Sequence, residues 1–192
     1  MKKNIIKYSV YKNVYWLTEP VFDYIGSFSE GVAPFQLGSS WGYINTDGDI
    51  VIEPRYDAAA EFYEGMALVM VQEKWGYIGH NGKIRIKPEF DYPCGSFHEG
   101  LAIVARHHPE DLKSIEDGGG HRLRSIYGYI NTKGEIVIPV QYDQADDFSE
   151  GLAAVKINDR YGYINRRGRI VIKPVFDKAE CFQNYRAVVC KE

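Results

Sequence analysis

Trp41-Gly42-Tyr43-Ile44-Asn45 is a stretch of sequence that is found three more times along the chain. It returns as Trp75-Gly76-Tyr77-Ile78, Tyr127-Gly128-Tyr129-Ile130-Asn131 and Tyr161-Gly162-Tyr163-Ile164-Asn165, at steps of 34, 52 and 34 residues. A second landmark is an aromatic residue followed by aspartate, at Asp23, Asp57, Asp91, Asp143 and Asp177, with steps of 34, 34, 52 and 34 residues. Because two landmarks share one period, we interpret the chain as a tandem repeat protein.

About five copies of a 34-residue unit account for most of the 192 residues. We expect them to form one repeat domain over residues 1–192, with copies at 7–40, 41–74, 75–126, 127–160 and 161–192. The first copy is degenerate and the last is decayed at its end. The 52-residue step exceeds the period by 18 residues, and 17 of these form an insertion that we place at residues 107–123.

Each copy is predicted to contain three β-strands. The first follows a Glu-Gly pair, as in residues 152–157, the second carries the aromatic-Gly-Tyr-Ile motif, and the third is an Ile-x-Ile stretch such as residues 170–172. Turns such as Asp47-Gly48 join the strands, because glycine tolerates the positive φ of a tight reversal. The predicted fold is therefore all-β, a tandem array of three-stranded antiparallel meanders. We prefer an open, twisted array; the alternative is a closed, propeller-like ring in which the last strand pairs with the N-terminal segment.

Single residues predict further details of each copy. Arg85, in the middle of Ile84-Arg85-Ile86, indicates that the middle residue of the third strand faces outward and that both isoleucines face the core. The landmark aspartate, as in Asp57, is expected to cap one helical turn of the connector to the next copy. That connector ends on Glu-Gly, and its glycine, as in Gly65, is expected in a left-handed conformation.

The repeated motif is interpreted as a packing device. Trp41 and Tyr43 lie two residues apart and share one face of a strand, while Gly42 allows a close approach on the other face. The residues assigned to this structural role are Trp41, Gly42, Trp75, Gly76, Tyr127, Gly128, Tyr161 and Gly162. The alternative is an exposed aromatic stripe that stacks on carbohydrate or cell-wall material.

Taken together, these slots resemble the WG-repeat family of bacteria. The resemblance rests on aromatic-Gly-Tyr-Ile-Asn, x-x-Gly-x-Ile-Val-Ile, Pro-x-aromatic-Asp and Phe-x-Glu-Gly-Leu-Ala-x-Val, and it covers most of residues 20–192. Tyr127 and Tyr161 depart from it, because the family pattern has Trp there. The resemblance implies an all-β repeat protein that serves as an interaction or binding module, and it supplies no catalytic residues.

Composition narrows the classes of partner and the compartment. The net charge of −3 and the 45% of hydrophobic residues are typical of a folded domain. The 23 basic residues do not exceed the 26 acidic ones, so neither a nucleic acid nor an anionic membrane is an expected partner. Three cysteines without CxxC spacing are interpreted as reduced, buried thiols, which favours a cytoplasmic location.

The insertion contains the candidate binding residues, because loops that break a repeat often carry specificity. These residues are His107, His108, Glu110, Asp111, Glu116, Asp117 and His121. Histidine and carboxylate side chains together suit zinc or nickel, so a metal-dependent enzyme is a third hypothesis. Their spacing matches no standard ligand motif, and we therefore assign neither a metal nor a cofactor.

The remaining charged residues are interpreted structurally. The recurring Asp and Glu residues of the copies are assigned to caps and turns, so no catalytic residue is assigned and the protein is predicted not to be an enzyme. Arg160, Arg166, Arg167 and Arg169 form a weak basic patch near one turn, either a solvated face or a docking spot for a partner.

The leading functional hypothesis is a non-enzymatic scaffold for an unidentified protein partner. It would bind through its extended surface and the 107–123 loop. Its oligomeric state is left open.

Overall fold

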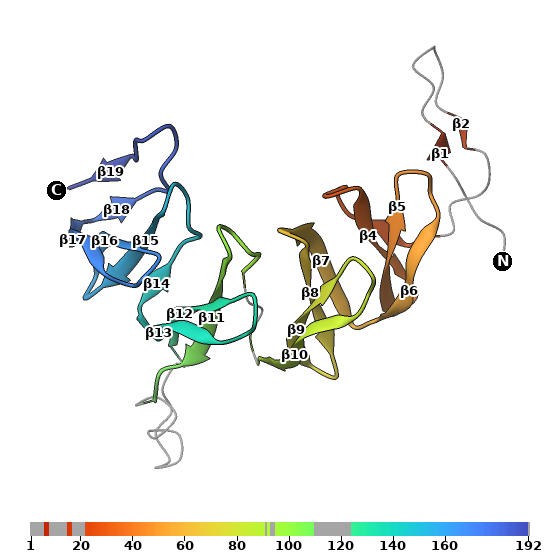
Figure 1. Ribbon diagram of the computed structural model, residues 1–192, viewed down its shortest axis with the longest axis horizontal. Helices are drawn as coiled ribbons and strands as arrows, with labels where there is room; N and C mark the ends of the chain where they lie inside the picture. Colours follow the sequence, from red (N-terminus) through yellow and green to blue (C-terminus); the bar gives the residue numbers. More distant parts are fainter. Residues whose placement is uncertain are drawn as a thin grey trace. The chain divides into compact units, whose positions relative to one another are not determined.

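The computed structural model describes residues 22–90, 92, 95–109 and 124–191, together with the strand pair β1 (Ile6–Lys7) and β2 (Tyr15–Trp16). Residue contacts divide the chain into two compact units, 1–89 and 90–192, and each is treated by itself (Figure 1). The nineteen elements that lie within the described residues are all β-strands, and they pair in small antiparallel sheets. The all-β repeat fold is thus confirmed, whereas the grouping of all copies into one domain stays a prediction. None of the described residues belongs to a helix long and apolar enough to cross a membrane.

The first unit contains two four-stranded sheets besides the β1–β2 pair. Their orders are β3-β4-β5-β6 and β7-β8-β9-β10, so neighbours in sequence are neighbours in the sheet. The strands are β3 (Tyr24–Ile25), β4 (Val32–Leu37), β5 (Ser40–Asn45), β6 (Ile50–Tyr56), β7 (Ala58–Tyr63), β8 (Met66–Val71), β9 (Lys74–Gly79) and β10 (Ile84–Phe90), the last of which reaches the boundary between the units.

The second unit contains a three-stranded sheet, a four-stranded sheet and a final strand pair. The strands are β11 (Leu101–His107), β12 (Ser125–Asn131), β13 (Ile136–Tyr142), β14 (Gln144–Ala145), β15 (Leu152–Ile157), β16 (Arg160–Asn165), β17 (Ile170–Phe176), β18 (Lys178–Ala179) and β19 (Val189–Cys190). β19 pairs with β18, through Ala179 and Val189, and not with the N-terminal segment as the ring alternative required. No sheet of the described strands closes on itself.

The connectors between copies are extended, so the predicted helical turn after the landmark aspartate is wrong. After Asp57 the chain continues as β7, in which Ala58 pairs with Met70 of β8. The carboxylate of Asp57 accepts a hydrogen bond from the backbone N–H of Gln72 at 2.7 Å. Asp23 and Asp143 make the same contact with the N–H groups of Gly38 and Asn158, at 2.6 and 2.9 Å. The aspartate therefore holds the tight turn between the first and second strands and does not cap a helix.

The Glu-Gly pairs form tight turns that also join successive copies. Glu30 and Gly31 have φ values of 51° and 83°, and Gly65 has 75°, which confirms the left-handed glycine. The carboxylate of Glu30 accepts the N–H of Gly65, one copy further on, at 3.0 Å. Glu99 bonds to Gly151 in the same way at 3.0 Å, and Glu150 bonds to Tyr185 at 2.7 Å. Each carboxylate thus satisfies a backbone donor of the following turn.

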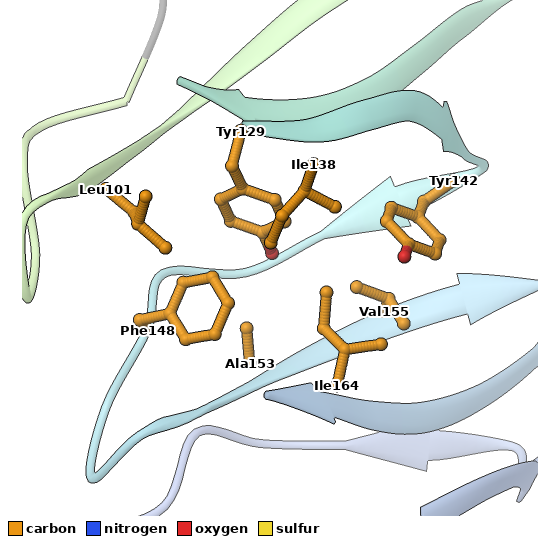
Figure 2. Close-up of a cluster of buried hydrophobic side chains, with 8 residues drawn as sticks. All are labelled: Leu101, Tyr129, Ile138, Tyr142, Phe148, Ala153, Val155 and Ile164. Carbon is orange, nitrogen blue, oxygen red and sulfur yellow. The ribbon is translucent and has the colours of Figure 1, made fainter. Parts of the chain in front are cut away.

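The core of each copy is built around the tyrosine of the motif. Tyr43, Tyr77, Tyr129 and Tyr163 are among the largest fully buried side chains. Tyr129 donates its hydroxyl hydrogen bond to the carbonyl of Asp146 at 2.7 Å, and its ring lies 4.9 Å from that of Phe148 in an edge contact. Figure 2 shows this ring among side chains from the β11–β13 and β14–β17 sheets, so the cluster holds two successive sheets together.

The third strand of each copy buries fewer isoleucines than predicted. Its middle residue faces outward as expected, with Val171 54% exposed. The second isoleucine is buried in three copies, as at Ile138, but Ile84 and Ile136 are 56% and 42% exposed. The prediction that both isoleucines face the core is therefore wrong, because the register shifts between this strand and its neighbour break the strict alternation.

Candidate interaction site at the insertion

The insertion leaves the sheet at a point where other copies close a hairpin with two residues. Ile157 pairs with Arg160, and the two residues between them, Asn158 and Asp159, have φ values of 48° and 65°. In the third copy the pairing of β11 with β12 continues one step further, to His107 and Ser125. The N–H of His108 then donates to the carbonyl of Arg124 at 2.8 Å. The insertion is thus an outgrowth of a hairpin, and its two ends are fixed by backbone hydrogen bonds.

A tyrosine from the preceding connector contacts the base of this hairpin. Tyr92 lies one place after the landmark Asp91. Its ring meets the ring of His107 edge-on at 4.8 Å, and its hydroxyl is 2.9 Å from Nδ1 of that histidine. His107 is therefore a half-buried part of the sheet. Sequence reasoning missed this contact, because the partners are separated by a complete strand.

The structure places only two of the seven predicted binding residues. His107 is the last residue of β11, and His108 follows it directly, half-buried. The other five lie outside the described residues: Glu110, Asp111, Glu116, Asp117 and His121. Among the described residues, no group of three or more His, Cys, Asp or Glu side chains could hold a metal ion.

The motif glycines lie where a third strand approaches most closely. A Cβ atom on Gly42, Gly76, Gly128 or Gly162 would lie 2.5–2.6 Å from the carbonyl oxygen of the facing isoleucine in the next strand. Real Cβ atoms do not approach backbone oxygens so closely, so these positions require glycine.

The first aromatic residue of the motif is less buried than the tyrosine that follows it. Trp41, Trp75, Tyr127 and Tyr161 are all half-buried. Trp41 packs at the margin of the cluster around Tyr43, and the ring of Tyr24 meets it edge-on at 5.6 Å. Sequence reasoning gave most weight to the tryptophan, whereas the tyrosine fills the core. The buried tyrosines have no free ring face for carbohydrate stacking.

A charged cluster that the sequence did not reveal lies in the connector before β15. Asp147 Oδ2 is 3.4 Å from Nε2 of His98, a residue 49 places earlier in the chain. Burial raises the pKa of Asp147, while the nearby His98 works in the opposite direction. Burial also raises the pKa of Asp146, and the negative charge of Asp147 adds to this effect. The ionised form of Asp146 is therefore less stable in the folded protein than in water.

We expect Asp146→Asn to raise the free energy of unfolding at pH 7, by less than about 1 kcal/mol because the group is half exposed. The raised pKa means that the folded state favours the protonated acid, so ionisation above the ordinary pKa of 3.8 costs stability. The gain should disappear below that pH, because Asp146 is then protonated in both states. Urea unfolding of the two proteins at pH 3 and pH 7 measures this difference. An equal gain at both pH values would contradict a cause in the charge.

Two of the three cysteines are exposed, contrary to the buried thiols predicted. Cys181 and Cys190 are free and lie on the surface, while Cys94 lies outside the described residues. The reason is local: the copy that contains both residues is the decayed last one, and its connector is open to solvent.

Comparison with known proteins identifies the repeat. The sequence model of one family, described as WG containing repeat, matches residues 16–39, 41–75, 75–105, 127–161 and 161–192. Its five matches agree with the five copies predicted, and they skip the insertion. No curated protein matches the chain.

Proposed function

Since the chain belongs to the WG-repeat family, we propose that it is a non-catalytic repeat scaffold that binds a protein partner through its insertion. The repeat itself is engaged in folding. The motif glycines sit against backbone, the tyrosines fill the core, and the aspartates and glutamates bond to turn N–H groups. These groups are occupied in the same way in several copies, so they do not distinguish one place on the surface from another.

The observation that carries the proposal is the way in which the insertion departs from the sheet. Other copies need two residues to close this hairpin, as Val71 pairs with Lys74. The third copy instead continues the ladder to His107 and Ser125 before the chain leaves it. A segment that the fold does not need, mounted on a rigid hairpin, is typical of a binding loop.

The balanced charge of the chain supports a protein partner and speaks against nucleic acid or an anionic membrane surface. Free, exposed thiols on Cys181 and Cys190 fit a reducing compartment, and we propose a cytoplasmic location.

Replacing residues 107–125 with Asn-Asp, the two residues of the 158–159 turn, is expected to abolish partner binding without unfolding the protein. The ladder would then close after Arg106 and Ile126, which correspond to Ile157 and Arg160. Affinity capture from native lysate, read by mass spectrometry, compares the shortened protein with the complete chain.

The matched control exchanges the 158–159 turn itself for Asn-Gly, which changes a tight turn and leaves the insertion intact. The control should retain every partner that the complete chain captures. If the shortened protein is folded by circular dichroism and still captures the same partners, the insertion is not the binding site.

A further inference from the structure

The outer edge of the four-stranded sheet in the second unit is formed by β17. The order of this sheet is β14-β15-β16-β17, and no described strand pairs with the far side of β17. Along the strand, Val171, Lys173 and Val175 face outward, and the two valines are 54% and 39% exposed. Exposed β-branched side chains beside unpaired backbone groups are the features to which an extended peptide adds as a further strand.

The same strand is strongly and uniformly positive. Residues 165–176 contain Arg166, Arg167, Arg169 and Lys173 and no acidic residue. The corresponding segments of other copies are mixed: residues 131–142 contain one lysine and one glutamate, and residues 45–56 contain three acidic residues and one arginine. The charge is therefore a property of this copy and not of the repeat.

Three of these cations are available to a partner. Arg166 is turned back toward the sheet, since its guanidinium lies 3.5 Å from the Cβ position of Gly100. Arg160, which the sequence grouped with this patch, forms an ion pair with Asp177. Arg167, Arg169 and Lys173 are exposed, and none of them has an acidic partner within the part of the chain that the structure describes.

We propose that the outer edge of β17 binds an acidic, extended peptide segment of a partner protein by β-strand addition. The backbone of the peptide would pair with the free edge of β17. Its apolar side chains would cover Val171 and Val175, and its carboxylates would neutralise Arg167, Arg169 and Lys173. The β10 edge also carries cations, at Arg85 and Lys87, but its outward residues there include no valine, so it lacks the apolar half of the surface.

This inference goes beyond the binding proposed for the insertion and can fail independently of it. The probe is a short, fluorescein-labelled peptide of alternating glutamate and valine, titrated into the complete protein at neutral pH and low ionic strength. We expect saturable binding by fluorescence anisotropy, weakened by salt. The double variant Arg167→Glu/Arg169→Glu should lose at least about tenfold in affinity, because the charge complementarity is reversed.

Two controls separate strand addition from simple charge attraction. A peptide of the same sequence with alternate backbone nitrogens methylated keeps its charge but loses the N–H groups of one edge, and it should not bind. Lys133→Glu occupies the same turn position in the preceding copy as Arg167 and should leave the affinity unchanged. Equal binding of the methylated peptide, or an unchanged affinity of the double variant, would overturn the proposal. A peptide that does not bind the unmodified protein at all would overturn it too.

Discussion

The substitution Gly128→Val is expected to lower the free energy of unfolding of the second unit by more than about 3 kcal/mol. A Cβ atom at this position would lie 2.6 Å from the carbonyl oxygen of Ile138 and 2.8 Å from the backbone of Pro139. Neither neighbour can move freely, because Tyr127 and Tyr129 pair with β13 on both sides of the glycine. The strands must separate to admit the side chain, and the buried cluster behind them would open. Urea unfolding followed by tyrosine fluorescence measures the loss.

A second glycine in the same unit provides the control. Gly151 has a φ of 80°, and a Cβ atom there would meet no other atom within 4 Å. Asparagine tolerates the left-handed region, so Gly151→Asn is expected to cost less than about 1 kcal/mol. If both substitutions had the same effect, the loss would come from replacing any glycine of the turns and strands, and the close approach at Gly128 would not be its cause.

The substitution Tyr129→Ala is expected to cost about 3 to 5 kcal/mol, comparable to removing other buried aromatic rings. The ring is fully buried and packs against Phe148. Its removal leaves a cavity between two sheets and deprives the carbonyl of Asp146 of its donor. Tyr129→Phe keeps the ring and should cost only about 1 to 3 kcal/mol, the penalty of a buried acceptor without a partner.

Tyr185 is the matched surface residue, since its side chain is 90% exposed. Tyr185→Ala should change the free energy of unfolding by no more than about 0.5 kcal/mol. Thermal and urea unfolding of the three variants give the comparison. A loss at Tyr129→Phe as large as that at Tyr129→Ala would mean that the hydrogen bond, and not the packing of the ring, provides the stability.

Most of the architecture could be predicted, because it depends on short patterns that recur. The alternation around the motif and the Gly-containing turns predicted strands and reversals that the structure contains, such as β12, β13 and the turn at Gly134. Repetition also made the insertion visible, since only a departure from a period can be measured. The ends of the insertion are placed by the pairing of His107 with Ser125, which no spacing could supply.

The errors arose where a local pattern has two solutions. The run Ala58-Ala59-Ala60 after Asp57 suits a helical turn as well as a strand, and the edge of β8 decided for the strand. An aspartate can cap a helix or accept a hydrogen bond from a distant turn, and Asp57 does the second. Tertiary context overrides local preference in such segments.

By itself the sequence determined the period, the number of copies, the order of strands and turns, and the residue at which regularity is lost. These properties are carried by neighbouring residues and repeated until chance is excluded. Only the tertiary structure decided which aromatic ring is buried, that Glu30 holds the turn of the next copy at Gly65, that His107 packs against Tyr92, and that Arg167 stays unpaired where Arg160 does not. Each of these depends on which groups approach each other across strands and copies. Burial and hydrogen bonding are properties of that meeting, and the order of residues along the chain does not contain it.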